Sequence, residues 1–148
     1  MLNIIMVNAW NYLGRGQDYV DRLKSGITRN LSVPHTFHVL TEADIPEGVE
    51  GFWCKIALFQ PGRFKGRCLF FDLDTVIVGN IDHIMKYDGE FAILRDFYAQ
   101  NEYGSAVMMW QSGFGKNIWD DWLTEGKPDR PKGDQQWIME KAPKADFL

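Results

Sequence analysis

The sequence predicts a single α/β domain with a mainly parallel central sheet flanked by helices. In the first half of the chain, apolar runs typical of buried strands alternate with segments of helical periodicity, in the order β-α-β-α-β. This alternation favours a parallel, doubly wound sheet, because parallel neighbours need a crossover connection between them. The length of 148 residues suffices for one hydrophobic core and is too short for two. We therefore expect residues 1–148 to form one domain.

The individual elements follow from local patterns. The expected elements before the middle of the chain are a strand over 2–7, a helix over about 17–30, a strand over 36–40 and a short helix over 53–59. Those expected after residue 79 are a short helical piece through Met85, strands over 91–94 and 106–110, and helices over 114–123 and 135–141. Trp119 and Trp122 lie three apart on one helix and are expected in the core or at an interaction surface.

Between these halves, residues 69–78 form an apolar run broken by two carboxylates, Asp72 and Asp74, and predict the third strand. Side chains alternate along a strand, so both carboxylates point the same way if the strand extends that far. Carboxylates that share a small volume repel each other, and Mg²⁺ or Mn²⁺ relieves this repulsion because these cations prefer oxygen ligands. Ligands of open α/β sheets gather beyond the carboxyl ends of strands, where this pair is expected. The alternative is a pair of solvated loop aspartates.

Composition narrows the class of protein. The net charge of −4 argues against nucleic-acid binding, and the 14% of aromatic residues supplies both core packing and platforms for bases and sugar rings. Cys54 and Cys68 are too few for a disulfide scaffold or a zinc site. The N-terminus has no signal-peptide pattern, and no apolar run approaches the ~20 residues that span a bilayer. We expect a cytoplasmic protein without a nucleic-acid partner or a transmembrane segment.

Two families place D-x-D after an apolar strand. Haloacid-dehalogenase-like phosphatases use the first aspartate as a nucleophile, and their pattern D-x-D-x-[TV]-[LVI] is similar to residues 72–77. Their core opens with that strand, whereas about half of this chain precedes it. GT-A glycosyltransferases use D-x-D to hold a metal against the diphosphate of a nucleotide sugar. The phosphatase is therefore kept as the second alternative.

Over nearly its whole length the chain resembles the GT-A nucleotide-diphospho-sugar transferases, especially the family 8 group of glycogenin-like and bacterial lipopolysaccharide galactosyltransferases. Asp72-Leu73-Asp74 resembles the metal motif of this group, residues 103–110 its N-[SA]-G-V strand along the donor sugar, and residues 133–136 its D-Q motif. The resemblance implies a Rossmann-like GT-A fold. It also implies transfer of a sugar from a nucleotide sugar, expected to be UDP-linked, to a carbohydrate or lipid-linked acceptor, with Mn²⁺ or Mg²⁺ bound by Asp72 and Asp74.

The resemblance further implies which residues bind the donor. Those expected at the nucleobase are Ala9, Trp10, Asn11 and Tyr12. Trp10 or Tyr12 would stack on the base, and the alternative is that they pack on the core. Lys55 has the position from which the family directs a basic side chain at the nucleotide, and the alternative is a solvated helix lysine. Leu73, within the metal motif, and Ser105, on the sugar-lining strand, complete this set.

Asp134 and Gln135 are the expected catalytic residues, facing the anomeric carbon and the acceptor hydroxyl, where a carboxylate positions or deprotonates the acceptor. The alternative is that Asp134 caps the N-terminus of a helix. The sequence departs from the family in two ways: Gly104 stands where the family often has Asn, and the C-terminal H-x-x-G-x-x-K-P segment, with a third metal ligand and a phosphate-binding lysine, is absent. A short transferase and a degenerate domain that binds the donor without turnover both fit this departure.

Overall fold

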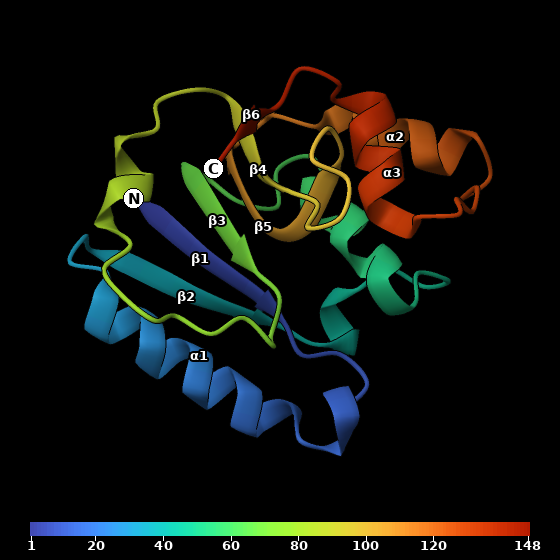
Figure 1. Ribbon diagram of the computed structural model, residues 1–148. Coiled ribbons are helices and arrows are strands. Elements are labelled where there is room, and N and C mark those ends of the chain that lie inside the picture. Colours follow the sequence, from blue (N-terminus) through green and yellow to red (C-terminus); the bar gives the residue numbers. More distant parts are fainter.

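A six-stranded sheet in the order β2-β1-β3-β5-β4-β6 runs through the computed structural model, which describes residues 1–148 (Figure 1). The strands are β1 (Leu2–Val7), β2 (His35–Leu40), β3 (Arg67–Phe71), β4 (Phe91–Arg95), β5 (Tyr103–Gln111) and β6 (Asp146–Phe147). β1 pairs in parallel with β2 and β3, and β4 pairs in parallel with β6. Only β5 runs antiparallel to its neighbours, β3 and β4. The predicted α/β class with a mainly parallel sheet is therefore confirmed.

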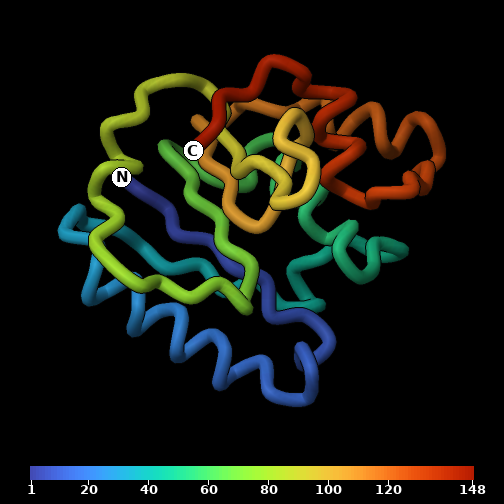
Figure 2. The backbone as a smooth tube through the Cα atoms, viewed as in Figure 1, coloured from blue at the N-terminus to red at the C-terminus, as the bar shows by residue number.

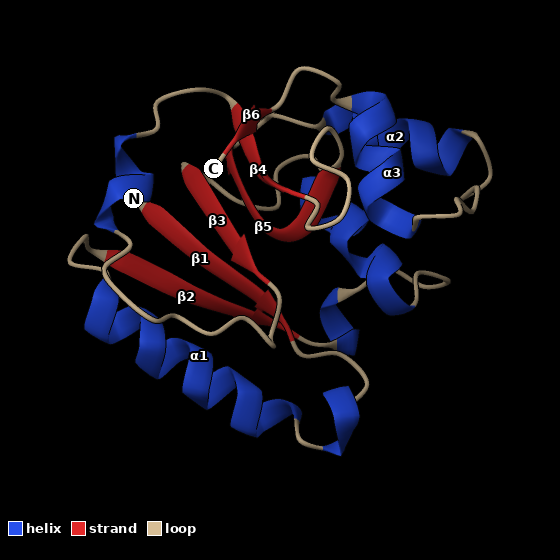
Figure 3. Cartoon of the chain, viewed as in Figure 1, coloured by secondary structure: helices blue, strands red, loops and turns tan.

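Helices cover both faces of this sheet (Figure 3). α1 (Gly16–Asn30) packs against one face, while α2 (Lys116–Thr124), α3 (Gly133–Lys141) and the 3₁₀ helix Gly51–Phe59 pack against the other. The alternation along β1 divides its side chains between these layers, since Ile4 and Met6 face α1 whereas Ile5 faces the opposite core. None of the helices is both long enough and apolar enough to cross a lipid bilayer.

Several expected boundaries shift once tertiary contacts are present. The helix expected over 53–59 is a 3₁₀ helix that begins at Gly51. The helix expected at residue 114 begins at Lys116, because Phe114 lies in a turn that its amide closes on the Gln111 carbonyl. The short strand β6 is absent from the prediction, since two residues carry no periodicity. Trp119 and Trp122 are both buried, which decides for the core rather than a surface.

The strand predicted over 69–78 ends at Phe71, so most of that prediction is wrong. The Asp72 amide makes a last bond to the Ala106 carbonyl, and the Asp72 carbonyl then accepts from the Thr75 amide at 3.0 Å, which closes a turn that favours Asp in first position. Figure 3 draws the residues that follow as a loop across the α1 side of the sheet. Val76 and Val78 point to solvent, with exposed fractions of 77% and 93%. The segment does alternate between apolar and polar residues, but the protein covers only one of its faces, where Ile77 packs beside Gly26 of α1.

Candidate functional site

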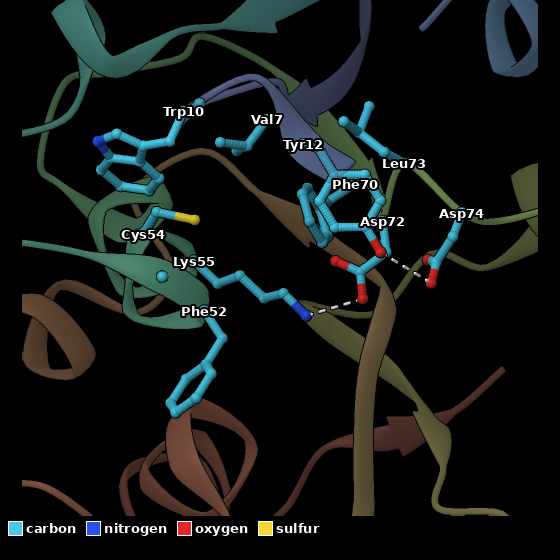
Figure 4. Close-up of a pocket in the computed structure, with 12 residues that line it drawn as sticks. Val7, Trp10, Tyr12, Phe52, Cys54, Lys55, Phe70, Asp72, Leu73 and Asp74 are labelled. Atoms are coloured by element: carbon cyan, nitrogen blue, oxygen red, sulfur yellow. Dashed lines mark hydrogen bonds and ion pairs between the residues drawn. The ribbon is translucent and has the colours of Figure 1, made fainter. Parts of the chain in front are cut away.

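Two neighbouring cavities of about 350 Å³ each open beyond the carboxyl ends of β1 and β3. The first cavity is lined by Val7, Ala9, Trp10, Tyr12, Gly51, Phe52, Cys54, Lys55, Phe70, Asp72, Leu73 and Asp74 (Figure 4). The second cavity is lined by Phe52, Lys55, Asp72, Ser105, Ala106, Pro131, Lys132, Gly133, Asp134 and Gln135. Three residues, Phe52, Lys55 and Asp72, line both cavities. The two spaces therefore share one wall.

This arrangement brings together nearly all of the residues predicted for the site. Of the expected donor-binding set, only Asn11 lines neither cavity. Its side-chain oxygen instead accepts a hydrogen bond from the Gly16 amide at 3.3 Å, which holds the loop against the start of α1. Ser105, Asp134 and Gln135 line the second cavity and the remaining members line the first. Segments far apart in the sequence thus meet beyond the carboxyl ends of β1 and β3.

The loop after β1 forms one side of the first cavity and is unusually strained. Trp10, Asn11 and Leu13 all have positive φ angles, of 56°, 49° and 49°. Left-handed backbone costs about 1–2 kcal/mol for each residue that carries a Cβ, and such strain is concentrated at binding sites. The Trp10 ring remains 48% exposed, whereas Tyr12 packs edge-on against Tyr19 with 5.3 Å between ring centroids. Trp10 is therefore the aromatic side chain of this loop that is free to stack on a ligand.

Lys55 bridges the wall between the two cavities, and it is not a solvated lysine. Its ammonium lies 2.8 Å from Asp72 Oδ2 and 3.2 Å from Ser105 Oγ, and its side chain is only 12% exposed (Figure 4). Burial opposes the charge, but Asp134 and Asp72 outweigh it and raise the pKa of Lys55. Lys55 is therefore a charged ammonium in a poorly solvated place, where its interaction with the neighbouring carboxylates is stronger than it would be in water.

Asp134 is the least satisfied polar group of the site. It is 5% exposed, and its Oδ2 atom has no hydrogen-bond partner. Burial raises the pKa of Asp134, while Lys55 and the Ser105 hydroxyl act in the opposite direction. The predicted alternative role as a helix cap is wrong, because α3 begins at Gly133 with Lys132 in the cap position and Asp134 in the first turn. An unpaired buried oxygen of this kind is costly and marks a place where a ligand group can bind.

Asp74 and Asp72 differ in their surroundings although both line the first cavity. Because β3 ends at Phe71, the condition under which the two carboxylates would share a strand face is not met. Asp74 is exposed and accepts only a long hydrogen bond, 3.4 Å, from the Tyr12 hydroxyl. Burial, followed by the charge of Asp74, raises the pKa of Tyr12. In Asp72, burial raises the carboxyl pKa against the opposing effect of Lys55.

The donor set is compatible with a divalent cation that shares its coordination with a ligand. Asp72 and Asp74 face one cavity and present hard oxygen atoms, and Asp74 has no cation of the protein beside it. No group of three or more His, Cys, Asp and Glu side chains is arranged to hold a metal by itself. Mg²⁺ is typically held by one or two carboxylates together with substrate phosphates and water. The pair therefore fits a cation brought in with a phosphorylated ligand.

Several lining residues were not predicted as site residues, Phe52 and Cys54 among them. Phe52 is 53% exposed at the shared wall, and Cys54 is nearly buried in the first cavity, where burial raises the pKa of its thiol to about 12. Their apolar character indicated core packing, and no spacing rule sets them apart from the other apolar residues of the 3₁₀ helix. Only the position of that helix beside β3 reveals them.

Comparison with solved structures identifies the class of fold. The chain superposes over 100% of its length on the glycosyltransferase GlyE from Streptococcus pneumoniae TIGR4, with a TM-score of 0.74 and 12% identity. It matches the galactosyltransferase LgtC in complex with donor and acceptor sugar analogs over 99% of its length, with a TM-score of 0.68 and 14% identity. Mouse xyloside xylosyltransferase 1 matches over 99% of the chain, with a TM-score of 0.56 and 13% identity.

The fold is therefore that of the GT-A glycosyltransferases, which confirms the resemblance drawn from the sequence at the level of fold. The chain spans 46% of the GlyE chain and 73% of the LgtC chain. No protein-family model matches the sequence, and no curated protein matches it significantly. The identities are low enough that the comparison establishes architecture rather than activity.

Proposed function

We propose that this chain is a glycosyltransferase domain that takes a sugar from a nucleotide-diphospho-sugar, with UDP as the carrier, and transfers it to a carbohydrate or lipid-linked acceptor. The observation that carries the proposal is the pair of cavities with a common wall. The first cavity is largely apolar and holds an exposed tryptophan, which suits a nucleoside. The second is polar and contains the unsatisfied Asp134, which suits a sugar with its hydroxyl groups.

The charged groups at the junction suit the diphosphate between nucleoside and sugar. In glycosyl transfer the bond from the anomeric carbon to the diphosphate oxygen breaks, and negative charge builds on the leaving group. Lys55 is a buried cation at the shared wall and would stabilise that charge. Asp72 and Asp74 would hold Mn²⁺ or Mg²⁺, which supplies Lewis-acid stabilisation of the leaving diphosphate. Asp134 and Gln135 would orient the sugar and the acceptor hydroxyl from the opposite side.

The structural neighbours support this proposal by analogy. GlyE, LgtC and the mouse xylosyltransferase are glycosyltransferases, and the LgtC structure contains donor and acceptor sugar analogs.

Calorimetric titration of UDP, with and without Mn²⁺, tests the donor site. We expect metal-dependent binding that Asp74→Ala abolishes, since Asp74 is exposed and its substitution leaves the core intact. Asp21→Ala, an exposed aspartate on α1, is the matched control and should bind UDP like the wild type. Absence of UDP binding under every condition would refute the proposal.

Turnover is then measured with a panel of UDP-sugars by release of UDP. Metal-dependent UDP binding without hydrolysis of any donor or transfer of its sugar would favour the degenerate, non-catalytic domain. Metal-dependent hydrolysis of a phosphomonoester, with phosphate attached to Asp72, would instead favour the phosphatase.

A further inference from the structure

The loop between β4 and β5, residues 96–102, carries two aromatic side chains that nothing in the chain covers. Phe97 is 87% exposed and Tyr98 is 99% exposed. Single exposed apolar residues are ordinary, but two consecutive aromatic residues that are both almost fully exposed are a candidate for a binding surface. Neither ring lines the first or the second cavity. The proposed donor site therefore does not account for them.

Internal hydrogen bonds hold this loop in one conformation. Asp96 Oδ1 accepts from the Tyr98 and Ala99 amides at 2.8 Å and 2.9 Å. The Arg95 guanidinium donates to the Gln100 carbonyl at 2.9 Å, and the Asp96 amide donates to the Glu102 carbonyl at 2.9 Å. Because the turn is already closed in this way, binding of a ligand at the loop costs little further backbone entropy.

The same loop is joined to the wall of the second cavity. The Gln135 amide group donates to Asp96 Oδ2 at 3.4 Å, and Lys132 forms an ion pair with Glu102. Both Gln135 and Lys132 line the second cavity. Phe97 directly follows Asp96, and consecutive Cα atoms are about 3.8 Å apart. The loop accordingly lies beside α3 (Figure 2), and Phe97 and Tyr98 follow directly on the residue that contacts the wall of this cavity.

The chemistry around the rings suits a neutral sugar. Gln100 and Asn101 are exposed amides that both donate and accept hydrogen bonds, as sugar hydroxyls require. The nearby cations are already engaged, since Lys132 pairs with Glu102 and Arg95 stacks on the Phe147 ring at 3.8 Å. The cations Arg95 and Lys132 are matched in number by Asp96 and Glu102, so the loop and its partner offer no net positive charge of the kind that an anionic membrane or a nucleic acid would need.

We propose that Phe97 and Tyr98 form the outer wall of an acceptor subsite, where they stack on the terminal ring of a neutral saccharide beside the second cavity. The proposal rests on the proposed glycosyltransferase function and specifies its acceptor as a carbohydrate. Stacking covers the apolar C–H face of the sugar, while the exposed amides of Gln100 and Asn101 bind its hydroxyl groups.

The test compares Phe97→Ser/Tyr98→Ser with Val76→Ser/Val78→Ser, a matched pair of exposed apolar residues away from the loop. Binding of lactose, maltose and cellobiose is measured by saturation-transfer NMR in the presence of UDP and Mn²⁺, and UDP binding by calorimetry. We expect at least one disaccharide to bind the wild type, with the aromatic double variant weakening this binding about tenfold, in line with loss of ring stacking. The control pair should bind both UDP and the disaccharide like the wild type.

Each outcome decides one question. If UDP binds but no disaccharide does, or if the double variant binds disaccharides as well as the wild type, the acceptor subsite is refuted and the donor site stands. If a disaccharide binds through the aromatic pair but UDP does not bind, the proposed function fails while the saccharide site stands. If the wild type self-associates and the double variant remains monomeric without any change in saccharide binding, the rings are a contact between copies, which also refutes the subsite.

Discussion

Replacement of Lys55 by Met tests whether the ion pair between Lys55 and Asp72 at the shared wall stabilises the folded protein. The substitution keeps an unbranched side chain of similar length but removes the ammonium that lies 2.8 Å from Asp72 Oδ2. Asp72 and the nearly buried Asp134 then face each other without a compensating cation. We expect the variant to fold but to be clearly less stable than the wild type at pH 7.

The magnitude follows from distance and exposure. At an effective dielectric constant of about 20, two unit charges 2.8 Å apart attract each other by roughly 6 kcal/mol. Desolvation of both ions offsets most of this attraction, and removal of one partner from a fully buried pair costs about 3–5 kcal/mol. Because the Asp72 side chain is 28% exposed, water compensates part of the loss. We expect a loss of about 2 kcal/mol in the free energy of unfolding, which is below the range for a fully buried pair because this pair is partly solvated.

The loss should depend on pH in a defined direction. Burial already raises the pKa of Asp72 and of Asp134, and removal of Lys55 raises both further. A carboxyl whose folded-state pKa is raised contributes stability below its unfolded pKa, and this stability is lost as pH rises through the folded pKa. The deficit of the Lys55→Met variant is therefore largest at neutral pH and narrows as acid protonates the two carboxyl groups.

Urea unfolding of both proteins at pH 7 and at pH 4.5 measures this difference. Lys144→Met, at an exposed lysine, is the matched control and should leave stability unchanged. Adding Asp134→Asn to Lys55→Met should recover part of the loss, since neighbouring sites in one network couple by about 0.5–3 kcal/mol. If the Lys55→Met variant is as stable as the wild type, or if its loss of stability does not depend on pH, the ion pair does not stabilise the protein as proposed.

Three further substitutions address individual features of the site. Trp10→Ala should weaken UDP binding about tenfold in calorimetry with little change in Tm, because base–aromatic stacking contributes roughly 1–3 kcal/mol and the ring is half exposed; unchanged affinity would exclude stacking on Trp10. Asp134→Asn should increase the free energy of unfolding at pH 7, since burial raises the carboxyl pKa from 3.8 and ionisation opposes folding; the gain should vanish near pH 3, and a loss at pH 7 would contradict this. Gly133→Ala should lower Tm more than Gly62→Ala, because both glycines have positive φ but only at Gly133 would a Cβ meet the Phe52 ring, at 2.5 Å; equal shifts would leave backbone strain as the sole cause.

The first half of the fold was largely predictable from sequence because its signals are local. Buried parallel strands are continuous apolar runs, so β1 was predicted with its observed bounds. An amphipathic helix repeats every few residues, so α1 was predicted to within one residue. The end of β3 was missed because 69–78 keeps an apolar alternation after Asp72 has turned the chain out of the sheet. Periodicity describes which side of a segment is covered, and it does not say whether a helix or a neighbouring strand covers it.

The sequence by itself determined that a pair of aspartates follows the third strand of an α/β domain, and every residue that it predicted for the site, except Asn11, lines one of the two cavities. Only the tertiary structure decided that Lys55, 17 residues before Asp72, reaches its carboxylate, and that Asp134 lies buried beside them without a partner for Oδ2. It also joined the 96–102 loop to Gln135 across 39 residues of chain. The physical reason is that secondary structure follows from the order of neighbouring residues, whereas a charged contact between distant segments depends on how helices and loops pack around the sheet.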